Sequence, residues 1–197
     1  MNDRKRPDHW TRKAKAQGYT ARSVFKLDEI QRRMPMLPPR SRVLDLGCSP
    51  GSWSAWVHDN GGPGTTLVGV DLQPSPGYPG HFVEGSALEL GPAALLGLLG
   101  GPADLVLSDM APRTTGNRFS DHVEQVVLAR MAFDLAVATL RPGGCFVCKI
   151  FDGEDAPALV EAIRLTFAEH RRFRPEATRT QSREFFIGAR GLRPPAP

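Results

Sequence analysis

From residue 42 onward, short apolar segments alternate with segments in which apolar residues recur at helical spacing. The segments that predict strands are 42–46, 65–72, 81–84, 104–108, 144–151, a stretch near 172–175, and 184–189. The segments that predict helices are 51–59, 92–99, 121–140 and 155–170. Strands that alternate with helices usually form a mostly parallel sheet, because each crossover helix packs on one of its faces. We therefore expect an α/β fold with helices on both faces of the sheet.

Two helices carry an apolar stripe that predicts which face they bury. The stripe of helix 22–34 consists of Val24, Leu27, Ile30 and Met34. The stripe of helix 121–140 consists of Val123, Val127, Met131 and Leu135. Asp121 and Glu124 have the spacing of a capping box, which predicts that the long helix begins at Asp121.

The chain is expected to form one domain over residues 21–191, with helix 22–34 ahead of an α/β core that begins at residue 42. Residues 1–20 are basic and lack a strong period, so we expect a flexible arm there. Residues 192–197 are expected to be a disordered tail.

Polar residues stand where the predicted strands end, and ligands of open α/β sheets bind beyond the carboxyl ends of the strands. Asp71, Asp109 and Lys149 each occupy such an end, as does the segment 45–51. Glu184 begins the last strand and reaches the same edge if that strand runs antiparallel. Lys149 is the most informative of these residues, because an amine at the end of an apolar strand is costly unless it is used or neutralised. These residues predict a single polar crevice.

The segment DLGCSPGSW (residues 45–53) predicts a ligand-binding loop followed by a helix. Gly47 and Gly51 allow a tight turn and a close approach of the backbone to a ligand. Dinucleotide sites use G-x-G-x-x-G, whereas this loop is G-x-x-x-G with Pro50 inserted, so it suits the methionine part of S-adenosylmethionine better than a pyrophosphate. Asp71 has the position of an acid that accepts hydrogen bonds from ribose hydroxyls. The alternatives are a plain strand-to-helix turn for the loop and a turn residue for Asp71.

Asp109 is either a turn residue before Met110-Ala111-Pro112 or a carboxylate that stabilises positive charge on a ligand. Lys26 lies at the border of the stripe of its helix, where a solvated lysine is common. On these grounds alone, Lys26 and Glu184 remain open.

The net charge of +4 conceals a strong segregation of charge. Residues 1–42 carry 12 Lys and Arg against 4 Asp and Glu, residues 43–170 carry 6 against 15, and residues 171–197 carry 7 against 2. Basic ends around an acidic middle favour a polyanionic partner, and RNA or DNA is the obvious candidate. The basic residues expected to contact phosphates are Arg4, Lys5, Arg6, Arg12, Lys13, Lys15 and Arg22 near the start, and Arg171, Arg172, Arg174, Arg179 and Arg183 near the end.

Three cysteines give no disulfide framework, and no His/Cys cluster has zinc spacing, so no metal site is predicted. Cys145 and Cys148 face opposite sides of a strand and are expected to be small core residues. No apolar run reaches the roughly 20 residues of a membrane span, and the first residues lack the apolar core of a secretory signal. We expect a cytoplasmic protein.

The motifs ARSVFKLDEI, VLDLGCSPGSW, GVDLQP, LSDMAP, LRPGGCFVCKIFDGE and SREFFIGA together resemble the blocks, in order, of the FtsJ (RlmE-type) ribosomal RNA 2′-O-ribose methyltransferases. The resemblance covers about Thr11 to Gly191. It implies a Rossmann-like S-adenosylmethionine-dependent methyltransferase fold, with a mostly parallel seven-stranded sheet and one antiparallel strand.

The resemblance also implies site residues. The Lys-Asp-Lys-Glu tetrad of the family maps to Lys26, Asp109, Lys149 and Glu184. The positions that contact S-adenosylmethionine map to Gly51, Trp53, Asp71, Ser86 and Asp109. Ser86 replaces an aspartate that often reaches the adenine, and a hydroxyl accepts hydrogen bonds more weakly than a carboxylate.

The expected reaction is transfer of a methyl group to a ribose hydroxyl, with Lys149 as the proton acceptor, Asp109 and Glu184 orienting it, and Lys26 helping to hold the nucleotide. Lys149 must be neutral to accept a proton. Burial and nearby positive charge favour the neutral form, whereas the two acids favour the charged form, in which Lys149 would only steer the hydroxyl. The resemblance implies a uridine in the peptidyl-transferase A-loop of 23S rRNA as the target and a monomer with no evident protein partner. The alternatives are a tRNA or mRNA-cap substrate, a non-catalytic RNA-binding module, and a nicotinamide oxidoreductase, which the glycine loop argues against.

Overall fold

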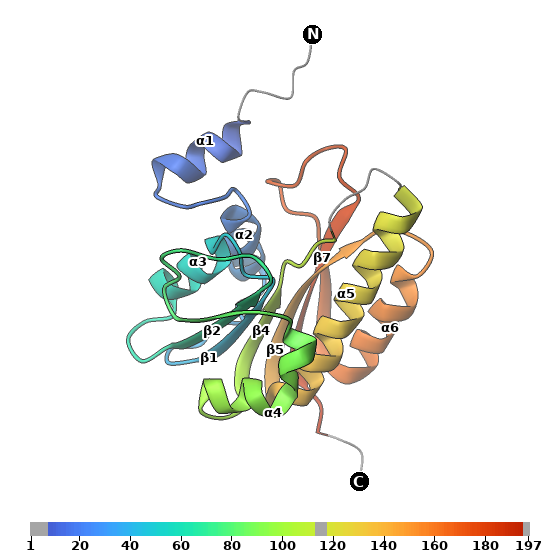
Figure 1. The fold of residues 1–197 in the computed structure, drawn as a ribbon. Coiled ribbons are helices and arrows are strands. Elements are labelled where there is room, and N and C mark those ends of the chain that lie inside the picture. The colour runs from blue at the N-terminus through green and yellow to red at the C-terminus, as the bar shows by residue number, and fades with distance from the viewer. Residues whose placement is uncertain (1–7, 113–117, 195–197) are drawn as a thin grey trace.

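The computed structural model describes residues 8–112 and 118–194. It contains a seven-stranded sheet of order β3-β2-β1-β4-β5-β7-β6 (Figure 1). The strands are β1 Arg42–Leu46, β2 Thr66–Asp71, β3 His81–Glu84, β4 Ala103–Ser108, β5 Leu140–Phe151, β6 Phe167–Phe173 and β7 Glu184–Leu192. The helices are α1 His9–Ala16, α2 Val24–Arg33, α3 Ser52–Asn60, α4 Ala87–Leu99, α5 Arg118–Thr139 and α6 Ala156–Thr166.

The expected α/β architecture is confirmed. The pairs of β1 with β2 and β4, of β2 with β3, and of β4 with β5 are all parallel, and β7 runs antiparallel to both of its neighbours, β5 and β6. The strand order reverses at β1, which pairs with β2 on one side and with β4 on the other. Such a reversal opens a crevice at the carboxyl ends of the two central strands.

Each face of the sheet packs against its own group of helices. On one face, α2 and α3 bury Leu27, Ile30 and Trp53 against strand residues such as Phe186. On the other face, α4, α5 and α6 cover a larger core, whose strand residues include Phe146. The predicted stripe of helix 22–34 is confirmed, because all four of its residues are buried.

The predicted stripe of the long helix is wrong in its first half only, because Leu135 is buried and Met131 packs against the core. Val123 is 38% exposed and Val127 is 61% exposed. The buried face of α5 instead follows small and polar residues, among them Gln125, Ala129 and Ala132. The predicted start is also wrong, because α5 begins at Arg118 and Asp121 lies in its first turn.

The end of the chain also differs from the prediction. Helix α6 ends at Thr166, whereas the periodicity predicted a helix as far as His170, and Phe167 is already the first residue of β6. Phe167 is 1% exposed, so its burial in the sheet outweighs the helical pattern of the preceding residues. Strand β7 includes Leu192, the first residue of the expected tail, and residues 195–197 lie outside the described part of the chain.

The expected N-terminal arm contains a helix. Helix α1 begins after Asp8, whose carboxylate accepts a hydrogen bond of 2.8 Å from the Thr11 N–H and forms an ion pair of 2.7 Å with Arg22. Ala14 is buried, so part of this segment packs on the domain. Residues 1–7 of the expected arm lie outside the described residues.

The cysteine prediction holds within the sheet. Cys148 belongs to the core under α4–α6, whereas Cys145 packs against the core under α2 and α3. Burial raises the pKa of Cys148 to about 12, so this thiol stays protonated. Among the described residues, no cluster of His, Cys, Asp or Glu has the arrangement of a metal site. None of the helices in the described part of the chain combines the length and apolarity needed to cross a membrane.

Candidate active site

Four strands deliver polar side chains to one edge and one face of the sheet. Asp45 lies near the end of β1, Asp109 directly follows β4, Lys149 lies near the end of β5, and Glu184 begins the reversed strand β7. Each of them is two positions from a strand residue of the core under α2 and α3. Because side chains alternate along a strand, all four point to the face that α2 and α3 cover.

Lys149 and Asp109 form the first of two buried ion pairs at this edge. The Lys149 ammonium lies 3.0 Å from Asp109 Oδ1, and its hydrogen bond goes to the Asp109 main-chain carbonyl at 2.7 Å. The contact between the Lys149 ammonium and the Asp109 carboxylate is therefore an ion pair whose geometry is not that of a hydrogen bond. The side chains are 7% and 21% exposed, so the Asp109 carboxylate remains partly accessible.

Lys26 and Glu184 form the second pair, through a hydrogen-bonded contact between the Lys26 ammonium and Glu184 Oε1. Lys26 comes from α2, and its ammonium also lies 5.3 Å from the centre of the Phe186 ring. Phe186 is the register partner of Lys149 in the β5–β7 ladder, so it connects the two pairs. Glu184 contacts Lys26 rather than Lys149, which differs from the expectation that both acids orient Lys149.

The loop between β1 and α3 forms the wall of a cleft next to the first pair. Gly51 has φ of 93°, a left-handed conformation that favours glycine, and it precedes the first turn of α3. Gly47 packs so closely on Met110 that a Cβ atom there would overlap the methionine side chain. The residues lining the cleft are Ser23, Asp45, Gly47, Cys48, Ser49, Pro50, Ser52, Trp53 and Asp109.

Asp45 is a fully buried acid in the wall of this cleft. Its Oδ2 accepts a hydrogen bond of 2.5 Å from Ser54, and its Oδ1 has no hydrogen-bond partner among the described residues. Burial raises the pKa of Asp45 to about 7; the Ser54 hydrogen bond opposes this increase, and weaker repulsion from Asp109 and Asp71 adds to it. The cleft therefore contains a buried acid whose ionised form a positively charged ligand would stabilise.

Of the other residues expected to bind a cofactor, Asp71 and Trp53 lie beside the same loop, whereas Ser86 lies apart from it. Asp71 ends β2, and its two oxygens accept main-chain N–H groups of Ser49 at 2.9 Å and Gln73 at 2.8 Å. Trp53 is 3% exposed, and its indole N–H donates to the Ser23 carbonyl at 2.8 Å. Ser86 precedes α4 and makes no capping hydrogen bond with its side chain.

The donor set fits S-adenosylmethionine, which carries an ammonium and a sulfonium. The unpartnered Asp45 oxygen and the partly accessible Asp109 carboxylate supply negative charge in one cleft. The first turn of α3 follows Gly51 in the wall of this cleft, and helix N-termini attract anions such as a ligand carboxylate.

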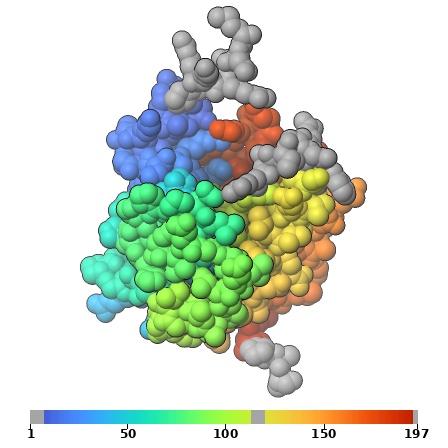
Figure 2. Space-filling model, viewed as in Figure 1, coloured from blue at the N-terminus to red at the C-terminus, as the bar shows by residue number. Residues whose placement is uncertain are grey.

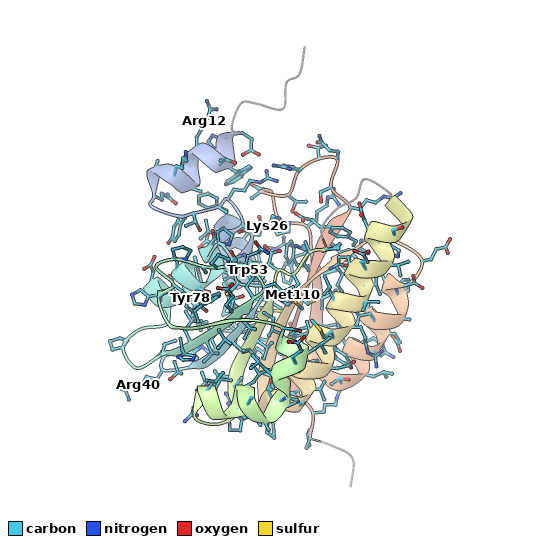
Figure 3. The ribbon with its side chains drawn as sticks, in the orientation of Figure 1. Arg12, Lys26, Arg40, Trp53, Tyr78 and Met110 are labelled. Atoms are coloured by element: carbon cyan, nitrogen blue, oxygen red, sulfur yellow. The ribbon has the colours of Figure 1, made fainter. Side chains whose placement is uncertain are left out.

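Figure 3 shows Lys26, Trp53 and Met110 together at the upper edge of the sheet, with Arg40 near the opposite edge. Among the cofactor positions named from the sequence, Ser86 lies furthest from the cleft beside β1. It follows β3, which is an edge strand of the sheet. It does not line the cleft.

Two residues near the site were assigned no role from the sequence. Asp45 was counted only as part of the glycine segment, although an acid inside an apolar strand is itself a signal. Gln125 was missed because it lies outside the apolar stripe that was used to orient its helix. Its place on the buried face of α5 is visible only in the structure.

Solved structures share this fold. A Plasmodium falciparum protein described as a ribosomal RNA methyltransferase superposes with a TM-score of 0.75 at 22% identity, over 88% of this chain and 98% of that one. An rRNA-methylase from Clostridium thermocellum superposes with a TM-score of 0.56 at 14% identity, over 85% and 95%. At these identities the likeness shows the fold alone, which is a Rossmann-like α/β fold.

The sequence comparisons are more specific. The family model of the FtsJ-like methyltransferases matches residues 19–192. The ribosomal RNA large subunit methyltransferase E of Desulfatibacillum aliphaticivorans is 45% identical over 91% of this chain and 88% of its own. The protein of the same name from Sorangium cellulosum is 48% identical over 94% and 88%. The chain therefore belongs to the FtsJ-like methyltransferase family.

Proposed function

We propose that this protein transfers the methyl group of S-adenosylmethionine to a ribose 2′-hydroxyl of large-subunit ribosomal RNA. The observation that carries the proposal is the presence of two lysine–carboxylate pairs at one edge of the sheet, one of which borders the cleft of the Gly51 loop through Asp109. The names of the relatives support the choice of ribosomal RNA. We further propose the uridine of the A-loop as the target and the cytoplasm as the place of action.

The cofactor, when bound, supplies a methyl group activated by a sulfonium and departs as a neutral thioether. The chain must then align the ribose and help remove one proton. Alignment in a reactive geometry contributes up to about 7–11 kcal/mol, and a positioned base contributes about 10²–10⁴-fold. The 2′-oxygen forms its bond to the methyl carbon, and in this proposal its proton passes to Lys149 Nζ.

The contacts of Lys149 leave two roles to distinguish. As a base, Lys149 has to be neutral when the ribose arrives. As a charged group paired with Asp109, Lys149 would instead donate to the ribose oxygen and steer it. We propose that Lys149 accepts the proton. If Lys149 only steers the ribose oxygen as a charged group, a replacement by arginine should keep the activity.

The cofactor is proposed to contact Gly51, Trp53, Asp71 and Asp109, with Asp45 facing its positive charge. The adenine contact of Ser86 stays a prediction. The connection of α1 to this region supports a shared binding surface, because the Thr20 hydroxyl bonds to the Pro50 carbonyl at 3.0 Å and to the Ser52 hydroxyl at 2.8 Å.

The surface above Lys26 supports RNA as the substrate. Helix α1 presents Arg12, Lys13 and Lys15, and Figure 3 shows Arg12 pointing away from the domain. The ring centres of Trp10 and Phe25 are 5.3 Å apart, and the Lys13 ammonium lies 5.2 Å and 4.8 Å from them. Half-buried aromatic rings next to cations are typical of surfaces that bind single-stranded RNA.

The segment before β7 faces this surface. The Glu29 carboxylate of α2 accepts the Glu176 N–H at 2.8 Å. Burial raises the pKa of Asp8, but the hydrogen bonds from Thr11 and the charges of Arg22 and Arg179 together lower that pKa below its usual value. Figure 2 shows this segment and the N-terminal segment side by side at the same edge. Helix α1 and the segment before β7 thus lie at the same edge as the proposed site.

The test is methyl transfer from labelled S-adenosylmethionine to ribosomal RNA from cells that lack this protein. We expect one 2′-O-methylated uridine in large-subunit RNA, detected by mass spectrometry of nucleosides and mapped by resistance to alkaline cleavage. Free RNA and assembled large subunits are assayed separately. Label on a base instead of a ribose, label on tRNA or a capped mRNA, or no transfer at all would contradict the proposal.

A further inference from the structure

Strand β5 extends beyond its neighbour β4 at the active-site edge. The β4–β5 ladder ends with Ser108 opposite Cys148, whereas β5 continues to Phe151. On its other side, β5 remains paired with β7 as far as Phe151 opposite Glu184. The main-chain groups of the last residues of β5 that point toward β4 therefore need other partners, because buried N–H and C=O groups are seldom left unpaired.

The side-chain amide of Gln125 supplies those partners. Its Nε2 donates to the Lys149 carbonyl at 2.7 Å, and its Oε1 accepts the Phe151 N–H at 2.7 Å. Gln125 is 0% exposed and comes from α5. One amide thus takes the place of one peptide unit of the missing strand.

These bonds hold the main chain from which the Lys149 side chain projects. The Lys149 carbonyl bonds to Gln125 of α5, while its ammonium lies on the α2–α3 side with the Asp109 carbonyl and carboxylate. Next to Gln125 on the same helix, the His122 ring packs closely against the Gly153 main chain. The first turns of α5 therefore hold the chain on both sides of Phe151.

We propose that Gln125 is a positioning residue for Lys149. It fixes the end of β5 so that the lysine nitrogen stays at its place beside Asp109. A displacement of about 1 Å at a reacting group lowers a rate by about 10²-fold, so the loss of the clamp acts on turnover although Gln125 touches no substrate. The inference rests on the proposed function.

The test replaces Gln125 by Leu, which keeps the approximate size and removes both hydrogen bonds, and by Glu, which keeps an acceptor for the Phe151 N–H. We expect Gln125→Leu to lower kcat about 10-fold to 100-fold with the KM for RNA unchanged, and Gln125→Glu to fall between this variant and the wild type. The pH dependence of kcat should shift in Gln125→Leu, because the surroundings of Lys149 change. Thr139→Val serves as the control, since it removes a buried hydrogen bond to Leu135 at the other end of α5.

A second measurement does not depend on activity. Hydrogen exchange of the Phe151 amide, followed by NMR in the unliganded protein, should be faster in Gln125→Leu and unchanged in Thr139→Val. Folded Gln125 variants with wild-type kcat, or a loss of kcat equal to that of Thr139→Val, would overturn the inference. An unchanged exchange rate of the Phe151 amide in Gln125→Leu would also overturn it. If the wild type itself transfers no methyl group to RNA, the proposed function fails instead.

Discussion

The two lysine–carboxylate pairs of the active-site edge are assembled in different ways. Lys149 and Asp109 come from adjacent parallel strands, so the sheet itself brings them together. Lys26 and Glu184 are 158 residues apart and meet only when α2 packs over β7. The first pair also borders the cofactor cleft, through Asp109, whereas the second lies on the side of α1.

This difference suggests a division of labour. A pair set by the sheet has little freedom, as a group that handles a proton requires. The Lys26–Glu184 pair joins α2 to the sheet. It therefore couples the position of α2, and of the basic helix α1 before it, to the same site. We therefore assign chemistry to the Lys149 pair and closure of the RNA side to the Lys26 pair, and the following experiments test that assignment.

Replacement of Lys149 should have the largest effect. Lys149→Ala should lower kcat by about 10²–10⁴-fold, because a positioned base contributes that much, with cofactor affinity unchanged. Lys149→Arg should be equally slow, since a guanidinium does not release its proton at neutral pH. Single-turnover methylation measures the rate, and calorimetry measures cofactor binding. If Lys149→Arg is as fast as the wild type, Lys149 is not the base and instead steers the ribose oxygen as a charged group.

Replacement of Glu184 should act on stability before it acts on chemistry. Glu184→Gln leaves the buried Lys26 ammonium without its counter-charge, and we expect the free energy of unfolding to fall by about 3 kcal/mol. The Lys26→Met/Glu184→Met double variant should recover most of that loss, because the uncompensated charge is gone. Both values come from urea denaturation.

The control for Glu184 is Glu161→Gln. Its pair with Arg164 is about half exposed, and exposed pairs contribute little, so no measurable change is expected. A Glu184→Gln variant as stable as Glu161→Gln would mean that the second pair does not hold α2 on the sheet.

Asp45 is a further acid at this edge and forms no ion pair within the described part of the chain, so it should respond to pH in the opposite sense to a paired carboxylate. Its pKa is raised from 3.8 to about 7, so the folded state retains a proton that the unfolded state has released. Stability should therefore fall as the pH rises from about 4 to about 7 and then level off. Relative to Asp45→Asn, the wild type should lose about 2 kcal/mol of unfolding free energy between about pH 5 and about pH 8.

Thermal and urea unfolding at both pH values measure this difference, and the comparison with Asn cancels groups that titrate in both proteins. Parallel pH curves for the two proteins would show that Asp45 is ionised throughout. S-adenosylmethionine should stabilise the wild type more strongly than Asp45→Asn at high pH, because only the carboxylate attracts its positive charge.

The sequence was sufficient for the parts of this edge that depend on strands. Lys149, Asp109 and Asp71 were located correctly at strand ends, because burial on both faces makes parallel strands uniformly apolar and their polar ends conspicuous. The presence of one antiparallel strand followed from the resemblance and not from periodicity, and the strand order was not predicted.

The parts that depend on helix faces were not predictable in the same way. The stripe through Val123 and Val127 suggested the wrong face of α5, because the buried face uses small alanines and a glutamine that carries two main-chain hydrogen bonds. The partner of Glu184 was also misjudged, since the contact with Lys26 depends on how α2 sits over the sheet. Hydrophobicity alone does not report hydrogen bonds to an unpaired strand end.

The smallest effect should come from the exposed cations of α1. The Arg12→Ala/Lys13→Ala/Lys15→Ala triple variant should weaken RNA binding about 10-fold at low salt and reduce the slope of log affinity against log salt by about 2, because each lost phosphate contact contributes about 0.7 on a single strand. Filter binding over a salt series gives both quantities. Arg164→Ala on α6 removes an exposed cation that pairs with Glu161, and its slope should equal that of the wild type. If the triple variant keeps the wild-type slope, α1 does not contact phosphates. The assignment of the Lys26–Glu184 pair to the RNA side of the site would then be wrong.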